Sequence, residues 1–346
     1  MSVVLITGGA GFVGTNLAER LLTAGERVRV LDDLSRPGVE ENLRWLEQRH
    51  GPRLQVEVGD VREESTTRRA LIEVGHVFHF AAQVAVTTSL EEPMHDAAVN
   101  LQGTLNVLEA ARAMSRPPSL LFTSTNKVYG ALPDVPLREE HGRYVPVDTQ
   151  LAAHGISEQR GLAFCTPYGC SKGAADQYVL DYAHSFGVPT TVFRMSCIYG
   201  PHQFGTEDQG WVAHFLIRAL SGEPLTIYGT GRQVRDILFA DDLVDAMLLA
   251  RRSAAALAGR ALNIGGGARC TVSLIDVIET IERLTHEPLA LAHEEWRTGD
   301  QRWYVSDTRA FQTATGWTPR VAPPDGIKAL HGWLSRERET AQDAVI

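Results

Sequence analysis

A tyrosine and a lysine four residues apart are the first residues in this sequence whose types and spacing could do chemistry. Tyr168 and Lys172 lie at positions i and i+4 of one predicted helix, so their side chains are neighbours on one face. The pKa of a phenol is about 10, and it must fall by about 3 units, or some 4 kcal/mol, before the group acts as a base near neutrality. A neighbouring ammonium is one source of that shift. The pair therefore predicts proton transfer with a hydroxyl group, although on an arbitrary helix the same spacing is most often a solvated pair.

A glycine-rich turn near the amino terminus is the second chemical signal. It follows the apolar run Val3 to Thr7 and opens a segment with helical periodicity. The turn fits G-x-G-x-x-G through Gly9, Gly11 and Gly14, and G-x-x-G-x-x-G when it is counted from Gly8. Such glycines let the backbone approach a pyrophosphate at the start of a helix, where unpaired N–H groups face the anion. With a strand before it and a helix after it, this turn predicts a dinucleotide site, the alternative being a merely structural turn.

Acidic residues at two predicted strand ends refine that site. Asp32 ends the second strand, where a carboxylate accepts hydrogen bonds from the adenosine ribose hydroxyls and repels a 2′-phosphate, so NAD is favoured over NADP. The positive nicotinamide ring is then a second source of the lowered tyrosine pKa, beside the Lys172 ammonium. Arg36 follows closely and could contact a phosphate or stack on adenine. Asp60 and Val61 end the third strand and could meet the adenine edge, although a strand-end aspartate is as often a turn or a helix cap.

The elements that must position these residues alternate between strand and helix. Strand-like segments are Val3 to Thr7, Val28 to Leu31, Leu54 to Val58, His76 to Phe80 and Leu120 to Phe122. This rhythm predicts the α/β class, with a doubly wound parallel (Rossmann) sheet and a smaller mixed α/β substrate lobe. Residues 1–194 form the predicted dinucleotide-binding domain, with return segments within 232–265, and 195–346 mainly form the lobe. Residues 131–166 lack periodicity and read as a long loop.

Composition excludes several classes of protein. The 346 residues carry a net charge of −9 without basic blocks, which disfavours nucleic acid as a partner. The four cysteines form no C-x-x-C pair, which favours reduced thiols and a cytoplasmic location. No stretch approaches the roughly 18 apolar residues of a membrane span, so no membrane contact is expected. His76 and His79 face opposite sides of a strand, and no metal site is predicted.

Together these motifs resemble the extended short-chain dehydrogenase/reductase family of NAD-dependent epimerases and dehydratases, which bind nucleotide sugars. The segments that carry the resemblance span the chain and are Gly8 to Gly14, Asp32, Phe122 to Gly130, Tyr168 with Lys172, Tyr228 to Asp236 and Arg297 to Asp300. The resemblance implies that Thr125 hydrogen-bonds the reacting hydroxyl, with Ser124 as the alternative. It also implies that Arg235 and Arg297 bind the nucleotide diphosphate, although either could instead form a surface ion pair.

The resemblance extends the expected NAD site beyond the glycine turn. The expected cofactor-binding residues are Gly8, Gly11, Phe12, Val13, Gly14, Asp32, Asp33, Ser35, Arg36, Asp60, Val61, Ala81, Ala82, Gln83, Asn100, Thr123, Tyr168, Lys172 and Ser196. Members of this family usually pair through two helices, which correspond here to Ala97–Met114 and Tyr168–Phe186. A homodimer or a dimer of dimers is therefore implied.

A narrower resemblance concerns the sugar. The segments around Thr125 and Tyr168, and above all 203–211, are similar to CDP-paratose (CDP-tyvelose) 2-epimerases. Within 203–211 the resemblance implies substrate contacts by Gln203, Gln209 and Trp211, in addition to Thr125.

The residues after Thr125 bear on the reaction. A 4,6-dehydratase of this family needs carboxylates there, but the positions hold Asn126 and Lys127. An epimerase needs no further acid, because the proton and the hydride removed from one face return to the other. We therefore predict C2 inversion of a CDP-linked 6-deoxy or 3,6-dideoxy hexose through a transient ketone. The alternatives are a 4-epimerase and, in a different class, a non-catalytic regulator that responds to NAD.

Overall fold

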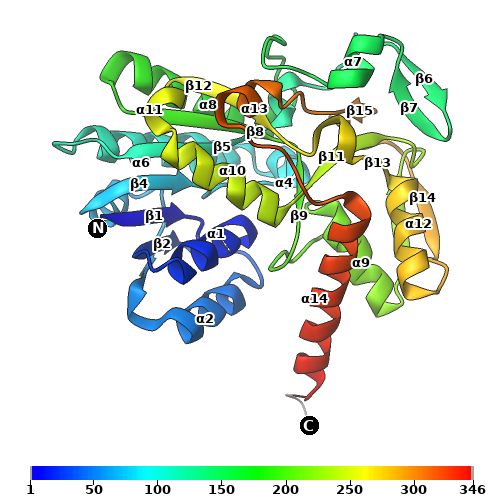
Figure 1. The fold of residues 1–346 in the computed structure, drawn as a ribbon, viewed down its shortest axis with the longest axis horizontal. Helices are drawn as coiled ribbons and strands as arrows, with labels where there is room; N and C mark the ends of the chain where they lie inside the picture. Colours follow the sequence, from blue (N-terminus) through cyan, green and yellow to red (C-terminus); the bar gives the residue numbers. More distant parts are fainter. Residues whose placement is uncertain (1, 344–346) are drawn as a thin grey trace.

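The computed structural model describes residues 2–343, and its largest feature is a sheet of seven strands (Figure 1). All neighbouring strands are parallel, in the order β12-β8-β5-β4-β1-β2-β3. Parallel strands need helical crossovers, and helices accordingly cover both faces of this sheet. The predicted doubly wound α/β class is confirmed. The strand order reverses at β1, between β2 and β4, which is where such folds form a ligand crevice.

The elements that build or cover this sheet are called the sheet half below. They are β1 (Val3–Thr7), α1 (Phe12–Thr23), β2 (Val28–Asp32), α2 (Val39–His50), β3 (Leu54–Val58), α3 (Glu64–Ala70), β4 (Val74–His79), α4 (Val86–Glu91), α5 (Pro93–Ala97), α6 (Gly103–Arg112), β5 (Ser119–Thr125), α8 (Pro167–Phe186), β8 (Thr190–Met195), α10 (Ala240–Arg252), α11 (Ala254–Leu257), β12 (Arg260–Ile264) and α13 (Arg309–Thr315).

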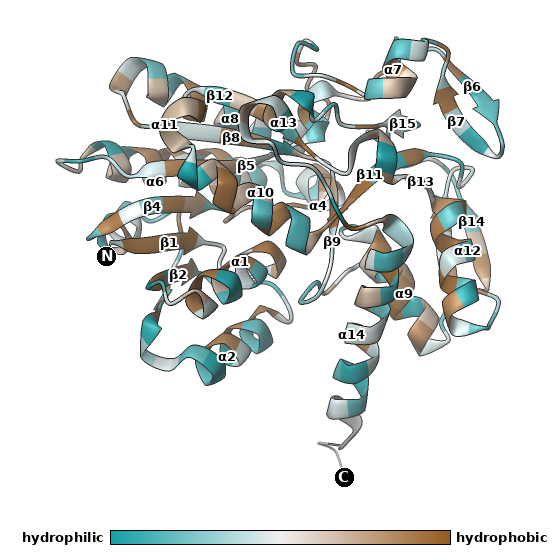
Figure 2. Cartoon of the chain, in the orientation of Figure 1, coloured by the Kyte–Doolittle hydropathy of each residue, from teal (hydrophilic) through white to brown (hydrophobic). Residues whose placement is uncertain are grey.

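Strand β1 shows why this half holds together. All five of its residues are buried, and it is drawn as hydrophobic in Figure 2. Its side chains alternate between the two faces: Val4 and Ile6 join one apolar cluster, and Val3 and Leu5 join the other. A fully apolar run is therefore what a central parallel strand requires, because both of its faces are covered.

The remaining elements form the second lobe, which lies at the right of Figure 1. They are β6 (Leu137–Glu140), β7 (Arg143–Pro146), α7 (Thr149–His154), β9 (Cys197–Tyr199), α9 (Trp211–Ser221), β10 (Leu225–Tyr228), β11 (Val234–Phe239), β13 (Thr271–Ser273), α12 (Leu274–Thr285), β14 (Leu291–Glu294), β15 (Trp303–Tyr304) and α14 (Pro323–Asp343). Strand β11 is the centre of this lobe, because it pairs with β9, β13 and β15. The chain returns from β11 to the large sheet through α10 and β12.

Two segments differ from the sequence-based expectation. Residues 131–166 are not a loop throughout, since they contain the hairpin β6–β7 and helix α7. The hairpin contacts a distant segment through the Tyr144 N–H, which donates to the Arg232 carbonyl at 3.1 Å. A contact between residues so far apart in the sequence cannot be predicted from a local sequence pattern. The helix expected over Ala97–Met114 is interrupted by a π-helical turn at Ala98–Gln102, and α6 ends at Arg112.

Residues 2–343 contain neither a membrane-spanning helix nor a cluster of metal ligands. No helix among them is both long and apolar enough to cross a bilayer. No three histidine, cysteine or carboxylate side chains among them gather in a way that could hold a metal ion.

Candidate active site

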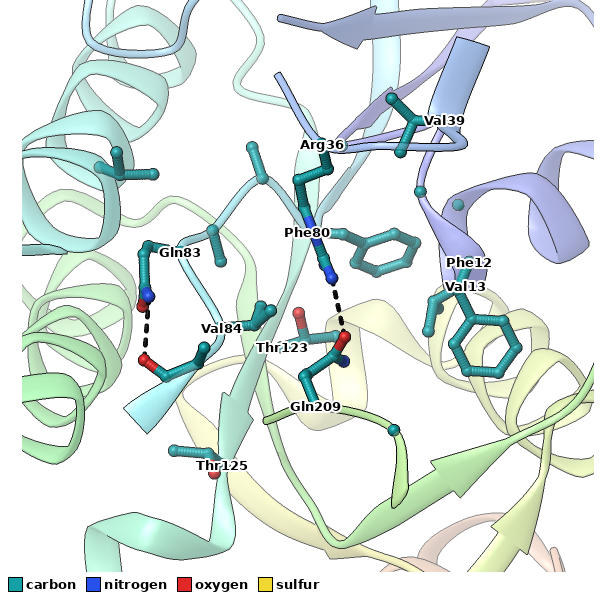
Figure 3. A pocket seen from close by; sticks show the side chains of 18 of the residues that line it. Phe12, Val13, Arg36, Val39, Phe80, Gln83, Val84, Thr123, Thr125 and Gln209 are labelled. Atoms are coloured by element: carbon teal, nitrogen blue, oxygen red, sulfur yellow. Dashed lines mark hydrogen bonds between the residues drawn. The ribbon is translucent and has the colours of Figure 1, made fainter. Parts of the chain in front are cut away.

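A cavity of about 560 Å³ opens at the carboxyl ends of β1, β2, β4, β5 and β8 (Figure 3). It brings together most of the residues expected from the sequence. Those that line it are Gly8, Gly11, Phe12, Val13, Gly14, Asp32, Asp33, Ser35, Arg36, Asp60, Val61, Ala81, Ala82, Gln83, Thr123, Thr125, Tyr168, Lys172, Ser196, Gln203, Gln209 and Trp211. Asn100, Arg235 and Arg297 do not line it.

The glycine turn forms one end of the cavity, and its glycines are sterically required. A Cβ on Gly14 would lie 2.5 Å from the Cα of Gly9 and closer still to the Gly8 carbonyl oxygen. Gly8 has a φ of +67°, and a Cβ there would lie 2.7 Å from the backbone nitrogen of Ala81. Helix α1 begins at Phe12, so its first N–H groups face the cavity. This arrangement fits the pyrophosphate of a dinucleotide.

Asp32 is held rigidly at the edge of this turn. Its two oxygens accept hydrogen bonds from the backbone N–H groups of Ala10 and Leu34, both at 3.0 Å. Burial raises the pKa of Asp32, and these two hydrogen bonds oppose that rise. The fixed carboxylate fits the ribose hydroxyls expected from the sequence.

Arg36 and Gln209 meet across the mouth of the cavity. The guanidinium Nη2 of Arg36 donates to Oε1 of Gln209 at 2.8 Å, and Figure 3 shows the two side chains pointing toward one another. Arg36 follows β2 in the sheet half, whereas Gln209 precedes α9 in the second lobe. Next to this bridge the ring of Phe204 packs directly on Gly38, where a Cβ would lie 2.5 Å from the ring. The two halves thus contact each other over the cofactor side of the cavity.

Tyr168 and Thr125 come from two different elements of the sheet half. Thr125 is the last residue of β5, and its Oγ1 accepts a hydrogen bond from the Lys127 backbone N–H at 3.2 Å. Tyr168 lies in the first turn of α8, which is capped by the Thr166 side chain. The Ser89 hydroxyl accepts the Tyr168 backbone N–H at 3.2 Å. The two hydroxyl groups hydrogen-bond one another, so a substrate hydroxyl could contact both.

The pKa values of the Tyr168–Lys172 pair move toward the neutral forms in the protein alone. Burial raises the pKa of Tyr168 to about 12, against the smaller lowering effect of the Thr125 hydrogen bond. Burial also lowers the pKa of Lys172 to about 7, while Asp176 and Asp96 act to raise it. In the protein alone, desolvation is the largest influence on the pKa of Tyr168. The lowering expected from Lys172 together with a positively charged nicotinamide ring concerns the cofactor-bound protein and stays a prediction. A further positive charge is needed before the phenol acts as a base.

Lys172 is enclosed by aromatic and acidic groups. Its ammonium lies 4.1 Å from the centre of the Phe122 ring, a cation–π arrangement. Asp176, one helical turn further along α8, accepts two hydrogen bonds from Arg194, both at 2.9 Å. Sequence reasoning missed Asp176, although the four-residue spacing from Tyr168 to Lys172 continues to it. That spacing could have indicated that Asp176 lies on the same helix face as Tyr168 and Lys172.

Asn100 lies behind the cavity wall rather than in it. Its amide donates to Asp96 Oδ1 at 3.0 Å and to Ser171 Oγ at 3.1 Å. It therefore ties the π-helical turn to α8 beside the Tyr168–Lys172 pair, and its expected contact with the cofactor stays a prediction.

The second lobe contributes the other wall of the cavity. Gln203 is buried there, and its amide donates to the Ile198 carbonyl at 3.2 Å. Trp211 begins α9 and lies half-buried at the same wall. Other lining residues that sequence reasoning missed, among them Thr206 and Asp208, fall inside the segment 203–211 that it had singled out.

The two arginines expected on a diphosphate are paired with the protein's own carboxylates. Arg235 Nη2 lies 3.5 Å from Asp300 Oδ1. Arg297 lies 3.6 Å from Glu207 and 3.5 Å from Asp208, and its guanidinium carbon is 3.7 Å from the centre of the Tyr228 ring. Their expected role on the substrate stays a prediction, and it requires phosphate oxygens to take the place of these carboxylates.

The chain is similar to several known proteins over nearly its whole length. A sequence model of the NAD dependent epimerase/dehydratase family matches residues 4–265. The chain is 40% identical to the CDP-paratose 2-epimerase of Salmonella typhi, over 96% of this chain and 99% of that protein. It is 32% identical to the UDP-glucose 4-epimerase of Mycolicibacterium smegmatis, over 93% of this chain and 95% of that protein. The solved structure of the Thermus thermophilus UDP-glucose 4-epimerase in complex with NAD matches with a TM-score of 0.80 and 30% identity, covering 96% of this chain and 99% of that one.

Proposed function

This chain belongs to the NAD dependent epimerase/dehydratase family, and from that premise we propose that it inverts C2 of a CDP-linked 6-deoxy or 3,6-dideoxy hexose. At the coarser level it is an NAD-dependent isomerase of nucleotide sugars, and the resemblance stated from the sequence is confirmed. The observation that carries the choice of C2 and of a CDP-linked sugar is the 40% identity to a CDP-paratose 2-epimerase over 96% of the chain.

The cavity supports cofactor binding at the sheet half. The crowded glycine turn, the start of α1 and the fixed Asp32 carboxylate fit a pyrophosphate and a ribose without a 2′-phosphate. NAD, when bound, supplies a hydride acceptor and donor and, in its oxidised form, a positively charged ring.

Three side chains of the protein then handle the substrate hydroxyl. Thr125 hydrogen-bonds the hydroxyl and orients it toward Tyr168, whose phenol removes the proton and later returns it. Because burial holds the pKa of Tyr168 near 12, positive charge beside the phenol is required. Lys172 supplies part of that charge, and Asp176 and Asp96 favour its protonated form.

The residues beside Thr125 favour inversion over dehydration. Asn126 is buried and donates to Gln301 Oε1 at 3.2 Å, and Lys127 is a cation. Neither can serve as the carboxyl acid or base that loss of water from the sugar requires. The ketone must therefore turn within the cavity and be reduced from its other face.

A 4-epimerase is the second candidate, because a UDP-glucose 4-epimerase is 32% identical to this chain. A regulator without catalysis is less well supported, since the fold brings Thr125, Tyr168 and Lys172 together at one wall.

The test uses CDP-paratose, CDP-glucose and UDP-glucose, each incubated with the enzyme without added oxidant or reductant. Proton NMR of the products should show an inverted C2 configuration for a CDP-linked sugar and no net NADH. Inversion at C4 would favour the second candidate. Stoichiometric NADH or loss of water from the sugar would contradict both.

A further inference from the structure

The ammonium of Lys127 lies in a group of charges that the proposed reaction does not yet use. Its Nζ donates to the Gly299 carbonyl at 3.2 Å and lies 3.9 Å from Asp300 Oδ1. The same carboxylate oxygen is 3.5 Å from Nη2 of Arg235. Two cations therefore share one carboxylate, and neither ion-pair contact is as short as a hydrogen bond.

The charges in this group do not balance. Among the side chains of residues 2–340, Asp300 is the one carboxylate within 4.0 Å of either cation. The Lys127 side chain is 20% exposed and that of Arg235 is 8% exposed, so little solvent compensates the second positive charge. Burial and the neighbouring Arg235 lower the pKa of Lys127, which is how an ammonium responds when it lacks a full counter-charge. The group is suited to receive an anion.

The group adjoins the cavity. Cys197 lines the cavity and interacts electrostatically with both Lys127 and Arg235. On the chain, Lys127 is two residues beyond Thr125, a separation that spans at most about 7 Å of backbone. The Lys127 backbone is thus close to the residue whose hydroxyl is expected to contact the reacting carbon.

That closeness matters for which carbon reacts. In a nucleotide sugar the phosphate is attached through the anomeric carbon, C1, and C2 is bonded to C1. C4 lies across the ring from C1. A cation carried by a residue two positions from Thr125 is therefore suited to draw the phosphate to the same end of the sugar as the reacting group, which favours C2 over C4.

The choice of lysine is itself informative. The chain has 33 lysines and arginines, and its sequence contains lysine at 127, 172 and 328 alone. Where almost every cation is arginine, the two lysines next to the cavity indicate positions that need a compact ammonium, because a planar guanidinium occupies more space and fixes its donors in a fork.

We propose that Lys127 binds the substrate phosphate next to the anomeric carbon together with Arg235, and thereby places C2 rather than C4 at Tyr168. The placement of C2 at Tyr168 rests on the proposed C2 inversion. The phosphate contact itself depends only on the charges around Asp300. Lys127 acts by placing the substrate and takes no part in proton transfer.

The test compares Lys127→Met and Lys127→Arg with Lys328→Met, which changes an exposed lysine of α14. Binding of CDP and of cytidine to the NAD-loaded enzyme is measured by calorimetry, with UDP and uridine as a second pair. Lys127→Met should weaken binding of the diphosphate about 10- to 100-fold, the usual loss of a hydrogen bond to a charged group, and leave the nucleoside unchanged. Lys127→Arg keeps the charge but not the compact ammonium, so it should recover only a small part of that loss. Lys328→Met should match the wild type in both measurements.

The outcomes separate this inference from the proposed function. Wild-type affinity of Lys127→Met for CDP and UDP would overturn the phosphate contact, and so would an equal loss for diphosphate and nucleoside, which would indicate a structural role. If Lys127→Met selectively loses affinity for the diphosphate but the wild-type enzyme inverts C4, the phosphate contact would be supported. The placement of C2 and the proposed function would then both be overturned. Selective loss with C2 inversion, and a C2 turnover reduced at least as much as the affinity, supports the whole inference.

Discussion

The two walls of the cavity are prepared for their ligands in different ways. On the sheet half, the glycine turn and Asp32 are fixed by backbone contacts, and their hydrogen-bonding groups already face the cavity. On the second lobe, Arg235 and Arg297 lie outside the lining of the cavity and are held by carboxylates of the protein itself. The groups of the sheet half are preformed, whereas the charges of these two arginines are balanced by the protein's own carboxylates.

The difference follows from what each wall is expected to hold. An epimerase regenerates its cofactor in each cycle, so a preformed wall that never exchanges its ligand loses nothing by rigidity. The sugar nucleotide must enter and leave, and the ketone must turn while bound. Partners that can be exchanged for phosphate oxygens allow this, because carboxylate and phosphate compete for the same donors.

The largest expected effect comes from a change that should lower turnover without changing ligand binding. Tyr168→Phe removes the phenol oxygen and its hydrogen bond to Thr125 but leaves the glycine turn and Asp32 in place, so turnover should fall by about 10³-fold or more, within the usual range for a general acid–base group. Binding of NAD and of CDP should stay within about twofold of the wild type. Steady-state kinetics and calorimetry measure the two properties.

Tyr178→Phe is the matched control for this change, since Tyr178 lies on the same helix and its side chain is exposed. It should retain full turnover. An active Tyr168→Phe variant would contradict the assignment of the proton transfer.

Breaking the preformed wall should have the next largest effect. Gly14→Ala forces a Cβ to within 2.5 Å of the Gly9 backbone, and the parallel sheet beneath the turn cannot relax to receive it. NAD affinity should fall by at least about 100-fold, as measured by calorimetry, because the pyrophosphate loses its close approach.

Gly161→Ala is the comparison for that variant, because a Cβ at Gly161 meets nothing within 4 Å. It should bind NAD normally. Normal NAD affinity in Gly14→Ala would show that the wall is not rigid.

Acid should weaken the sheet half through its buried histidines. Burial lowers the pKa values of His76 and His79 to about 3, below the 6.5 of the unfolded chain. The unfolded chain therefore binds more protons below pH 6.5, so the free energy of unfolding is unaffected by these groups above that pH and falls as the pH drops toward 3. At pH 5.5 each histidine should lower it by about 1.4 kcal/mol.

Urea unfolding at pH 7.5 and 5.5 measures this loss, and His76→Gln should reduce the loss by the share of one histidine. His141→Gln, which changes a histidine whose side chain is 91% exposed, should leave the loss unchanged. An equal loss in wild type and His76→Gln would contradict the burial argument.

The smallest expected effect concerns Arg297, whose charge is balanced by carboxylates of the protein itself. Asp208→Asn removes one of the two carboxylates that hold Arg297, and the freed guanidinium should bind CDP or UDP about two- to fivefold more tightly at low salt. The gain should shrink at high ionic strength, because these charges are partly exposed. Asp325→Asn, at an exposed position in α14, serves as the control. Weaker binding in Asp208→Asn would mean that the carboxylate itself contacts the ligand.

The same contrast explains how much could be predicted from the sequence. The glycine turn, Asp32 and the Tyr168–Lys172 pair depend on contacts within one crossover or one helix turn, so local spacing was enough to predict the fold class and family, both confirmed. The environment of Lys127 depends on Asp300, and the hairpin β6–β7 contacts the distant Arg232. Such long-range contacts leave no periodic pattern. The pKa of Tyr168 in the protein alone could not be predicted either, because its largest influence is burial, which depends on the whole fold.

The short segment from Thr125 to Lys127 limits how activities on this scaffold can diverge. The Lys127 backbone N–H fixes the Thr125 hydroxyl, while the Lys127 side chain reaches Asp300. An insertion or deletion here would displace both ends at once, and the hydroxyl would lose its orientation. Within this segment, new specificities can therefore arise by exchanging side chains at 126 and 127 without a change in its length, so an evolutionary path between reactions on this fold can run through single substitutions.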